Sequence, residues 1–313
     1  MDIDFSGVLV QMGVLFVILA LGFICKRVHI TNDAVDKGLS GIVIKVTMPM
    51  LIVSSVVNAS VLPNTEELLR CFLYCCIVQL LLFALAAAFT KILRVPRGEK
   101  GVFCFMIAFA NVGFLGIPVV AALFGGDAVI YVAIVNLPFN IMAFTLGVRL
   151  ITSDNSESPC PKFSVKTLFT PGILASVIAI AFAFLHIQHI PFVGEALSML
   201  GSFSTPGALL VIGSQLGNLT ARDMLGTPKI WALCVSRLLL CPLVVYALMS
   251  HFIVSPVVLG VLSVCAAMPA ANLASMFCLQ YGGNGKLASQ GILLSTAASF
   301  VTIPIGVVLI SFI

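Results

Sequence analysis

Long apolar runs without charged residues recur along the whole chain of 313 residues, and short polar segments separate them. Most of the runs have about twenty residues or more, which lets a helix cross roughly 30 Å of hydrocarbon. The pattern predicts ten membrane-spanning helices and no separate soluble domain. Their approximate bounds are 6–26, 38–58, 69–91, 100–123, 128–150, 167–186, 192–217, 228–250, 255–281 and 287–312.

Two islands interrupt the fourth and ninth of these runs, at 110–118 and 268–272. Each contains a proline, Pro118 in the first and Pro269 in the second. A proline inside a helix lacks an N–H and clashes with the carbonyl four residues earlier, so backbone polar groups become free. Within a bilayer such groups are tolerated only where protein buries them or water reaches them. Interrupted spans in corresponding places of two halves point to the binding site of a transporter.

The islands contain groups that suit a carboxylate. The second half of a broken helix starts with free N–H groups at the positive end of the helix dipole. Asn111 and Asn272 each add an amide that can donate two hydrogen bonds. The alternative is that each asparagine only satisfies carbonyls freed by its neighbouring proline. The candidate substrate-binding residues are Asn111, Gly113, Pro118, Pro269 and Asn272, with Gly113 allowing the backbones to cross closely.

Composition excludes an ordinary soluble domain, because 60% of the residues are hydrophobic, 9% are charged and the mean hydropathy is +1.18. Cytoplasmic loops of membrane proteins carry an excess of Lys and Arg. In this chain 13 of 16 basic residues fall in alternate loops. This predicts a multi-pass protein of the cell membrane with both termini extracellular or periplasmic. The net charge of +4 then reflects topology and no nucleic-acid partner.

Charges within the runs bear on the sign of the ligand. All twelve acidic residues fall in loops or near the ends of runs. A proton relay usually needs Asp, Glu or His inside the bundle, whereas amide and backbone oxygens remain available to sodium. Lys45 and Arg237 do enter the second and eighth runs, where a charge costs about 2.5–3.5 kcal/mol on insertion scales. Each either reaches the interface by its long stem or lines the cavity and attracts an anion.

The ten cysteines and four histidines form no C-x-x-C pair and no group at metal-ligand spacing. We interpret the thiols as small buried hydrophobes. We expect no metal, no cofactor and no catalytic residue.

An internal repeat relates the two halves. Moving 157 residues along the chain brings Pro49 onto Pro206 and Thr47 onto Ser204. The same shift lays the segment 124–127 on 281–284, both at the ends of interrupted runs. Five runs per half is an odd number, so the second half would enter the membrane with opposite polarity. Pro118 and Pro269 do not superpose under this shift, and a chance resemblance among apolar helices is the alternative.

The repeat divides the chain into a first five-helix unit at 1–150, a polar cytoplasmic linker at 151–166 and a second unit at 167–313. Pro49 and Pro206 kink their runs beside hydroxyl side chains. These kinks either only bend the helices or line the cavity. The possible lining residues are Lys45, Thr47, Pro49, Ser204, Thr205, Pro206 and Arg237.

The island at 110–118, the Thr47-Met48-Pro49 kink and the strings at 204–209 and 291–296 together resemble the auxin efflux carrier family over the whole chain. That family includes plant PIN-FORMED proteins and bacterial malate and malonate permeases. The resemblance implies an all-α membrane fold of ten helices in two inverted five-helix repeats, with broken helices four and nine crossing at mid-membrane. It also implies a scaffold of helices 1, 2, 6 and 7, which forms a homodimer, and a moving transport bundle of helices 3–5 and 8–10.

The long cytoplasmic loop of the plant members is absent from this chain, which weakens auxin as its substrate. We expect a secondary transporter of small organic anions, mono- or dicarboxylates, that works in the lipid bilayer by elevator-like alternating access. Uniport and proton coupling both remain open. The alternatives are a ligand-binding membrane sensor that retains the transporter fold and an intramembrane enzyme. Against an enzyme stands the lack of a nucleophile–base pair or of paired acids within the runs.

Overall fold

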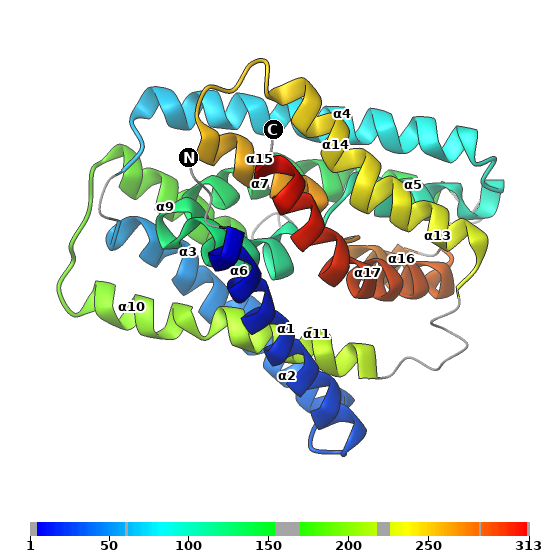
Figure 1. Ribbon diagram of the computed structural model, residues 1–313, viewed down its shortest axis with the longest axis horizontal. Helices are drawn as coiled ribbons and strands as arrows, with labels where there is room; N and C mark the ends of the chain where they lie inside the picture. Colours follow the sequence, from blue (N-terminus) through cyan, green and yellow to red (C-terminus); the bar gives the residue numbers. More distant parts are fainter. Residues whose placement is uncertain (1–4, 60–61, 154–169, 218–225, 282, 312–313) are drawn as a thin grey trace.

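The computed structural model describes residues 5–59, 62–153, 170–217, 226–281 and 283–311. All regular elements in these ranges are helices, and no strand occurs among them (Figure 1). The predicted linker at 151–166 lies outside the described residues from position 154 onward.

The described part of the first half contains eight α-helices and three π-helical turns, with 3₁₀ turns η2 (Arg97–Glu99) and η4 (Gly126–Ala128) between them. In chain order the others are α1 (Phe5–Arg27), α2 (Asp33–Ile42), η1 (Val43–Thr47), α3 (Met48–Val57), α4 (Thr65–Ile92), α5 (Lys100–Ala108), η3 (Val112–Gly116), α6 (Ile117–Phe124), α7 (Val129–Met142), η5 (Ala143–Gly147) and α8 (Val148–Thr152).

The described part of the second half contains eight α-helices and one π-helical turn. They are α9 (Pro171–Phe184), α10 (Val193–Ser202), α11 (Ser204–Gly217), α13 (Pro228–Val235), the π-helical turn η7 (Ser236–Leu240), α14 (Cys241–Met249), α15 (Pro256–Ala267), α16 (Leu273–Tyr281) and α17 (Gly285–Ser311).

Six helical segments of the described chain are long and apolar enough to cross a membrane: Asp33–Val57, Thr65–Ile92, Gly126–Thr152, Val193–Ser214, Pro228–Met249 and Gly285–Gly306. The prediction of an all-helical membrane protein is therefore confirmed. The count of ten spans and the inverted repeat stay predictions. The fourth and ninth predicted runs are each divided into two shorter helices, and α9 has 14 residues.

Several helices begin before their apolar runs because polar residues cap them. The side chain of Asn32 accepts hydrogen bonds from the N–H groups of Ala34 and Val35, so α2 starts at Asp33 and not at position 38. The side chain of Asn64 accepts from the N–H of Glu67 at the start of α4. Such caps satisfy N–H groups that have no partner within the helix. The capped turns extend the helices beyond the segment that hydropathy alone predicts.

Prolines follow three of the four π-helical turns in the described chain, and η5 is the exception. Pro49, Pro118 and Pro242 each follow such a turn by two residues, after η1, η3 and η7 respectively. A proline removes the hydrogen bond to the carbonyl four residues earlier and pushes against it, which favours a wider turn at that point. Pro206 differs, because it lies in the first turn of α11, where a missing N–H costs little.

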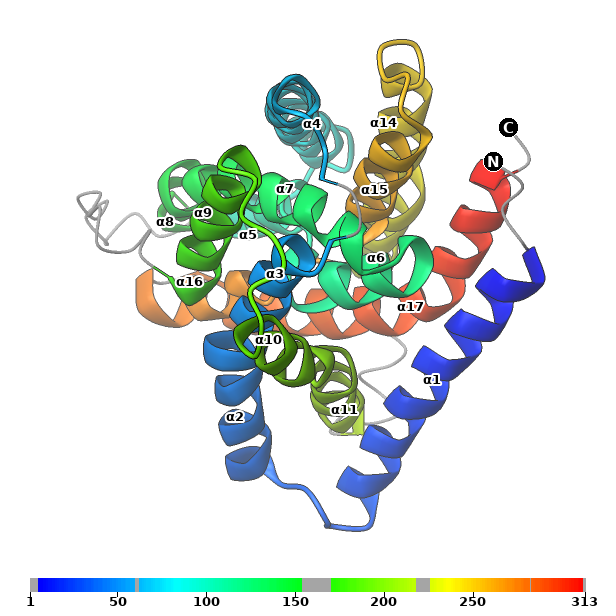
Figure 2. The same cartoon turned by 90° about the vertical axis from the view of Figure 1, so that its left-hand side faces the viewer.

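Figures 1 and 2 both show α1, α2, α10 and α11 on one side of the molecule and α4 and α14 on the opposite side. Helices α1 and α11 cross closely because glycines line their contact. A Cβ atom at Gly22 would collide with the backbone of Leu210, and one at Gly213 would collide with that of Leu19. Small residues let helix backbones approach in this way inside membranes.

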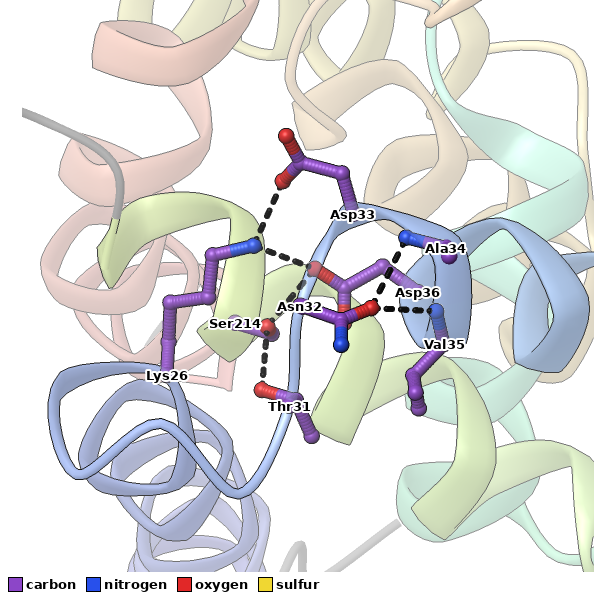
Figure 3. A network of polar contacts seen from close by, with 8 residues as sticks. All are labelled: Lys26, Thr31, Asn32, Asp33, Ala34, Val35, Asp36 and Ser214. Carbon is purple, nitrogen blue, oxygen red and sulfur yellow. Dashed lines mark hydrogen bonds and ion pairs between the residues drawn. The ribbon is translucent and has the colours of Figure 1, made fainter.

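A polar network joins the α1–α2 hairpin to α11 (Figure 3). Lys26 Nζ lies 2.6 Å from Asp33 Oδ1 and 3.0 Å from Asp36 Oδ2. Ser214 Oγ donates to Asp36 Oδ2 at 2.8 Å and lies 2.9 Å from Thr31 Oγ1. Asp36 is buried, and its charge is compensated by the ammonium and the hydroxyl. This network fixes the hairpin against the end of α11.

Candidate functional site

The two islands identified in the sequence are breaks between helices. Helix α5 ends at Ala108, and Phe109 is extended before η3 starts at Val112. Helix α15 ends at Ala267, and Met268 is extended before α16 starts at Leu273. Each break therefore has a helix C-terminus on one side and a helix N-terminus on the other.

The two breaks cross and pair with each other. Asn111 N donates to Pro269 O at 2.7 Å, and Ala271 N donates to Phe109 O at 2.9 Å. The residues between them, Ala110 and Ala270, form an isolated antiparallel bridge. Backbone groups that the breaks would leave unpaired thus satisfy each other, as an apolar surrounding requires.

Side chains from three other helices stabilise the crossing. Gln79 of α4 donates from Nε2 to Ala108 O at 3.2 Å. Arg237 of η7 donates from Nε to Met268 O at 2.9 Å and from Nη1 to Ile107 O at 2.8 Å. Ser295 Oγ of α17 accepts from Ala270 N at 3.2 Å. The C-terminal ends of α5 and α15 are therefore held by fixed donors.

The N-terminal ends of η3 and α16 remain more open. Asn111 Oδ1 accepts from Phe114 N at 3.3 Å and so caps η3. The N–H groups of Gly113 and Leu273 have no hydrogen-bond partner among the described residues, and neither does the side-chain amide of Asn272. All five of these residues border one cavity. The cavity therefore has unpaired donors from both breaks.

This cavity has a volume of about 210 Å³ and lies where the crossing meets α3, α7 and α9. Four asparagines supply its amide groups: Asn111, Asn136, Asn140 and Asn272. The rest of the wall is mainly apolar, with Ile44, Met48, Ile52, Phe114, Ile117, Phe139, Phe144, Ile173, Leu273 and Met276 among the lining residues. No charged side chain from the described part of the chain belongs to this wall.

Asn136 and Asn140 were not among the predicted residues. Asn136 Nδ2 donates to Val132 O at 3.0 Å, and Asn140 Nδ2 donates to Asn136 O at 2.7 Å. Both amides bond to their own helix and leave polar atoms available toward the cavity. Their spacing of four residues, with Pro138 between them, is a signal of one polar helix face that sequence analysis offers.

The predicted binding residues fall into two groups. Asn111, Gly113 and Asn272 line the cavity, and they come together from both breaks. Pro118 is buried in α6 away from the cavity wall, and Pro269 takes part through its carbonyl, which accepts from Asn111 N.

The possible lining residues near the proline kinks do not border this cavity. Thr47 and Pro49 are buried, but their neighbours Ile44, Met48 and Ile52 form that part of the wall. Ser204 is buried, whereas Thr205 and Pro206 are half-buried in the first turn of α11. The hydroxyl of Ser204 bonds to Thr47, which joins the two kinks.

The two cations inside the predicted runs also lie outside the cavity wall. Lys45 is exposed in η1, next to the lining residue Ile44. Arg237 is fully buried behind the crossing, so it neither reaches an interface nor lines the cavity. Its two backbone acceptors, Met268 and Ile107, were not foreseen from the sequence because they depend on how η7 packs.

Comparison with known proteins identifies the family to which the chain belongs. The family model described as membrane transport protein matches residues 8–307. An uncharacterized transporter of Methanothermobacter thermautotrophicus is 25% identical over 293 residues, which cover 92% of this chain and 94% of that protein. An uncharacterized transporter of Methanocaldococcus jannaschii is 25% identical over 311 residues, covering 94% and 97%. The chain therefore belongs to the membrane transport protein family, the auxin efflux carrier family that its sequence resembles, and is a multi-pass membrane transporter.

Proposed function

We propose that this transporter carries small organic anions, and specifically carboxylates, which bind in the cavity at the crossing of the two breaks. One observation carries the proposal: unpaired N–H and amide donors from both breaks border one cavity that has no charged side chain among its described lining residues. The N-terminus of a helix is equivalent to about half a positive charge. Two such ends and several amides favour a carboxylate over a cation or a neutral ligand.

The lining narrows the class of carboxylate. A volume of about 210 Å³ suits a small molecule. One carboxylate can lie against Asn111 and Asn272, whereas a second would find only the neutral amides of Asn136 and Asn140 in a mainly apolar wall. Burying an unpaired charge there is costly. A monocarboxylate with an apolar body therefore fits better than a dicarboxylate, although the sequence left both open.

The placement of the cavity supports alternating access. We assign α1–α3 and α9–α11 to a scaffold, and α4–α8 and α13–α17 to a transport bundle, which together make two inverted five-helix repeats, 1–150 and 167–313. The cavity is lined by Ile52 and Ile173 from the proposed scaffold and by Asn111, Asn140 and Asn272 from the proposed bundle. A ligand between the two groups can be carried when the bundle moves against the scaffold.

Local pairing supports the inverted repeat. Residues related by a two-fold axis meet only close to that axis. Thr47 and Ser204, which are 157 residues apart, are hydrogen-bonded, and Ala110 and Ala270, which are 160 residues apart, form an antiparallel bridge with local two-fold symmetry. We place this axis in the membrane plane, with both termini outside and a homodimer formed through the scaffold, as the loop charges and the family resemblance imply.

The absence of Asp, Glu and His from the described cavity wall favours uniport over proton coupling. With the cytoplasm negative, uniport of an anion runs outward. An imposed voltage should therefore drive uptake of labelled carboxylate into proteoliposomes. Uptake that ignores voltage and follows a pH gradient would show that uniport is wrong.

A thermal-shift screen of mono- and dicarboxylates on the purified protein tests the site. Monocarboxylates are expected to raise the melting temperature of the wild type, and Asn111→Ala and Asn272→Ala are expected to reduce that shift. Asn58→Ala is the matched control, because Asn58 Nδ2 donates to Gly194 O at 2.9 Å away from the cavity. Unchanged ligand shifts in both site variants would overturn the site. Binding without counterflow of labelled ligand would identify a sensor.

A further inference from the structure

The buried cation Arg237 has contacts that the proposed binding site does not explain. None of its surface is exposed, and it lies in the π-helical turn η7. Its guanidinium donates to Met268 O, at the end of α15, and to Ile107 O, at the end of α5. The third nitrogen, Nη2, makes no hydrogen bond with the described residues. One side chain thus holds the C-terminal ends of both broken helices.

Arg237 has no carboxylate partner within the described ranges of the chain. The titratable groups that interact with it are the thiols of Cys241 and Cys265. A buried charge requires compensation, and here it comes from backbone carbonyls. Each helix C-terminus is equivalent to about half a negative charge. Two such ends together are therefore matched to one guanidinium.

The pairing of Arg237 with both helix C-termini changes the electrostatic field in the cavity. At each break the negative end of one helix lies beside the positive end of the next, so the two ends partly cancel for a nearby ligand. Arg237 neutralises the negative ends of α5 and α15. The positive ends of η3 and α16, where Gly113 and Leu273 border the cavity, are then left uncancelled.

We propose that Arg237 is the positioning residue that makes the site select anions, because it cancels the negative ends of both breaks without touching the ligand. This inference rests on the proposed transport of carboxylates. The preference for anions then comes from a side chain behind the crossing as well as from the amides in the cavity wall.

The test compares a carboxylate with its neutral counterpart, phenylacetate with phenylacetamide, as ligands of the purified full-length protein. The two ligands have nearly the same shape and differ in charge, so the ratio of their affinities reports the electrostatic field in the cavity. The affinity for the neutral phenylacetamide reports the shape of the site. Arg237→Met removes the charge. A unit charge on the order of 10 Å away, at an effective dielectric of about 20, changes affinity on the order of tenfold, so the ratio should fall by about that factor.

Two further variants separate charge from geometry. Arg237→Lys keeps the charge but cannot offer the planar fork, so it should keep most of the ratio while the protein melts at a lower temperature. Gln79→Leu removes a neutral donor from Ala108 O, beside the carbonyl that Arg237 binds. It should weaken both ligands alike and leave their ratio unchanged.

The outcomes distinguish a failure of the carboxylate site from a failure of the role proposed for Arg237. A wild type that binds both ligands equally would contradict the carboxylate site itself, whatever Arg237 does. A wild-type preference that survives in folded Arg237→Met would overturn the role of Arg237 and leave the carboxylate site standing. If Arg237→Met does not fold, Arg237→Lys decides: a retained ratio supports the inference, and a lost ratio shows that geometry and not charge sets the preference.

Discussion

Ser204 Oγ donates a hydrogen bond to Thr47 Oγ1 at 3.0 Å, although the two residues are 157 positions apart. The same interval defines the predicted internal repeat, and both residues are buried two positions before a proline. Thr47 Oγ1 lies 3.5 Å from Val43 O, to which it donates in turn. A small polar chain therefore connects η1 to the first turn of α11.

Removing both hydroxyls of this pair should destabilise the protein by less than the sum of the two single removals. Thr47→Val leaves the buried hydroxyl of Ser204 without its acceptor, and a buried unsatisfied group costs about 1–3 kcal/mol. The double variant Thr47→Val with Ser204→Ala should lose less than the sum of the single variants. Unfolding free energies of the three variants in detergent measure this coupling. Strictly additive values would show that the pair does not interact.

The hairpin network predicts different effects for two neighbouring acids. Asp36 is 6% exposed and bonds to both Lys26 and Ser214, so Asp36→Asn should cost about 3 kcal/mol. Asp33, whose side chain is 88% exposed, also pairs with Lys26, and Asp33→Asn should cost less than about 1 kcal/mol. Melting temperatures at low and high salt distinguish the two. Equal losses would contradict the burial of the Asp36 pair.

Glycines of the α1–α11 contact should not tolerate a methyl group. Gly213→Ala would push a Cβ into the backbone of Leu19, and such overpacking costs about 1–3 kcal/mol. Gly41→Ala in α2 meets nothing within 4 Å and should be neutral or stabilise the protein by about 0.5–1 kcal/mol. The free energy of unfolding should therefore fall in Gly213→Ala and stay equal or rise in Gly41→Ala. A tolerated Gly213→Ala would argue against the close crossing.

A new cation at the cavity should change the preferred ligand. Met276 lines the cavity and is 59% exposed, so the stem of a lysine fits there. Met276→Lys is expected to raise the affinity for a dicarboxylate relative to a monocarboxylate, because the second charge gains a partner. Met199→Lys, at an exposed position of α10 away from the cavity, is the control. Thermal shifts with succinate and phenylacetate give the comparison, and equal responses of the two variants would count against the site.

Local chemistry explains several features of the fold, of which the two breaks were predicted and the helix caps and π-helical turns were not. Asn32 and Asn64 cap helices, and the prolines at 49, 118 and 242 follow π-helical turns, because each acts on backbone groups within four residues of itself. The breaks at the two islands have the same origin. These features need no knowledge of the rest of the chain.

The site required more than local chemistry. Asn111 and Asn272 were foreseen as partners, but Asn136 and Asn140 were not, since their side chains count only once α7 faces the crossing. Arg237 was expected to reach an interface or the cavity, and it does neither. In an apolar run a residue can face lipid, cavity or another helix at similar cost, so periodicity there is weak.

The order of residues along the chain was enough to predict a membrane protein and two broken helices, because hydrocarbon excludes unpaired backbone groups and proline creates them. The pairing of the breaks through Ala110 and Ala270, and the contact of Arg237 with their carbonyl ends, became known from the packing of the helices. Dipoles and hydrogen-bond donors act over a few ångströms, so their effect depends on which distant segments packing brings together.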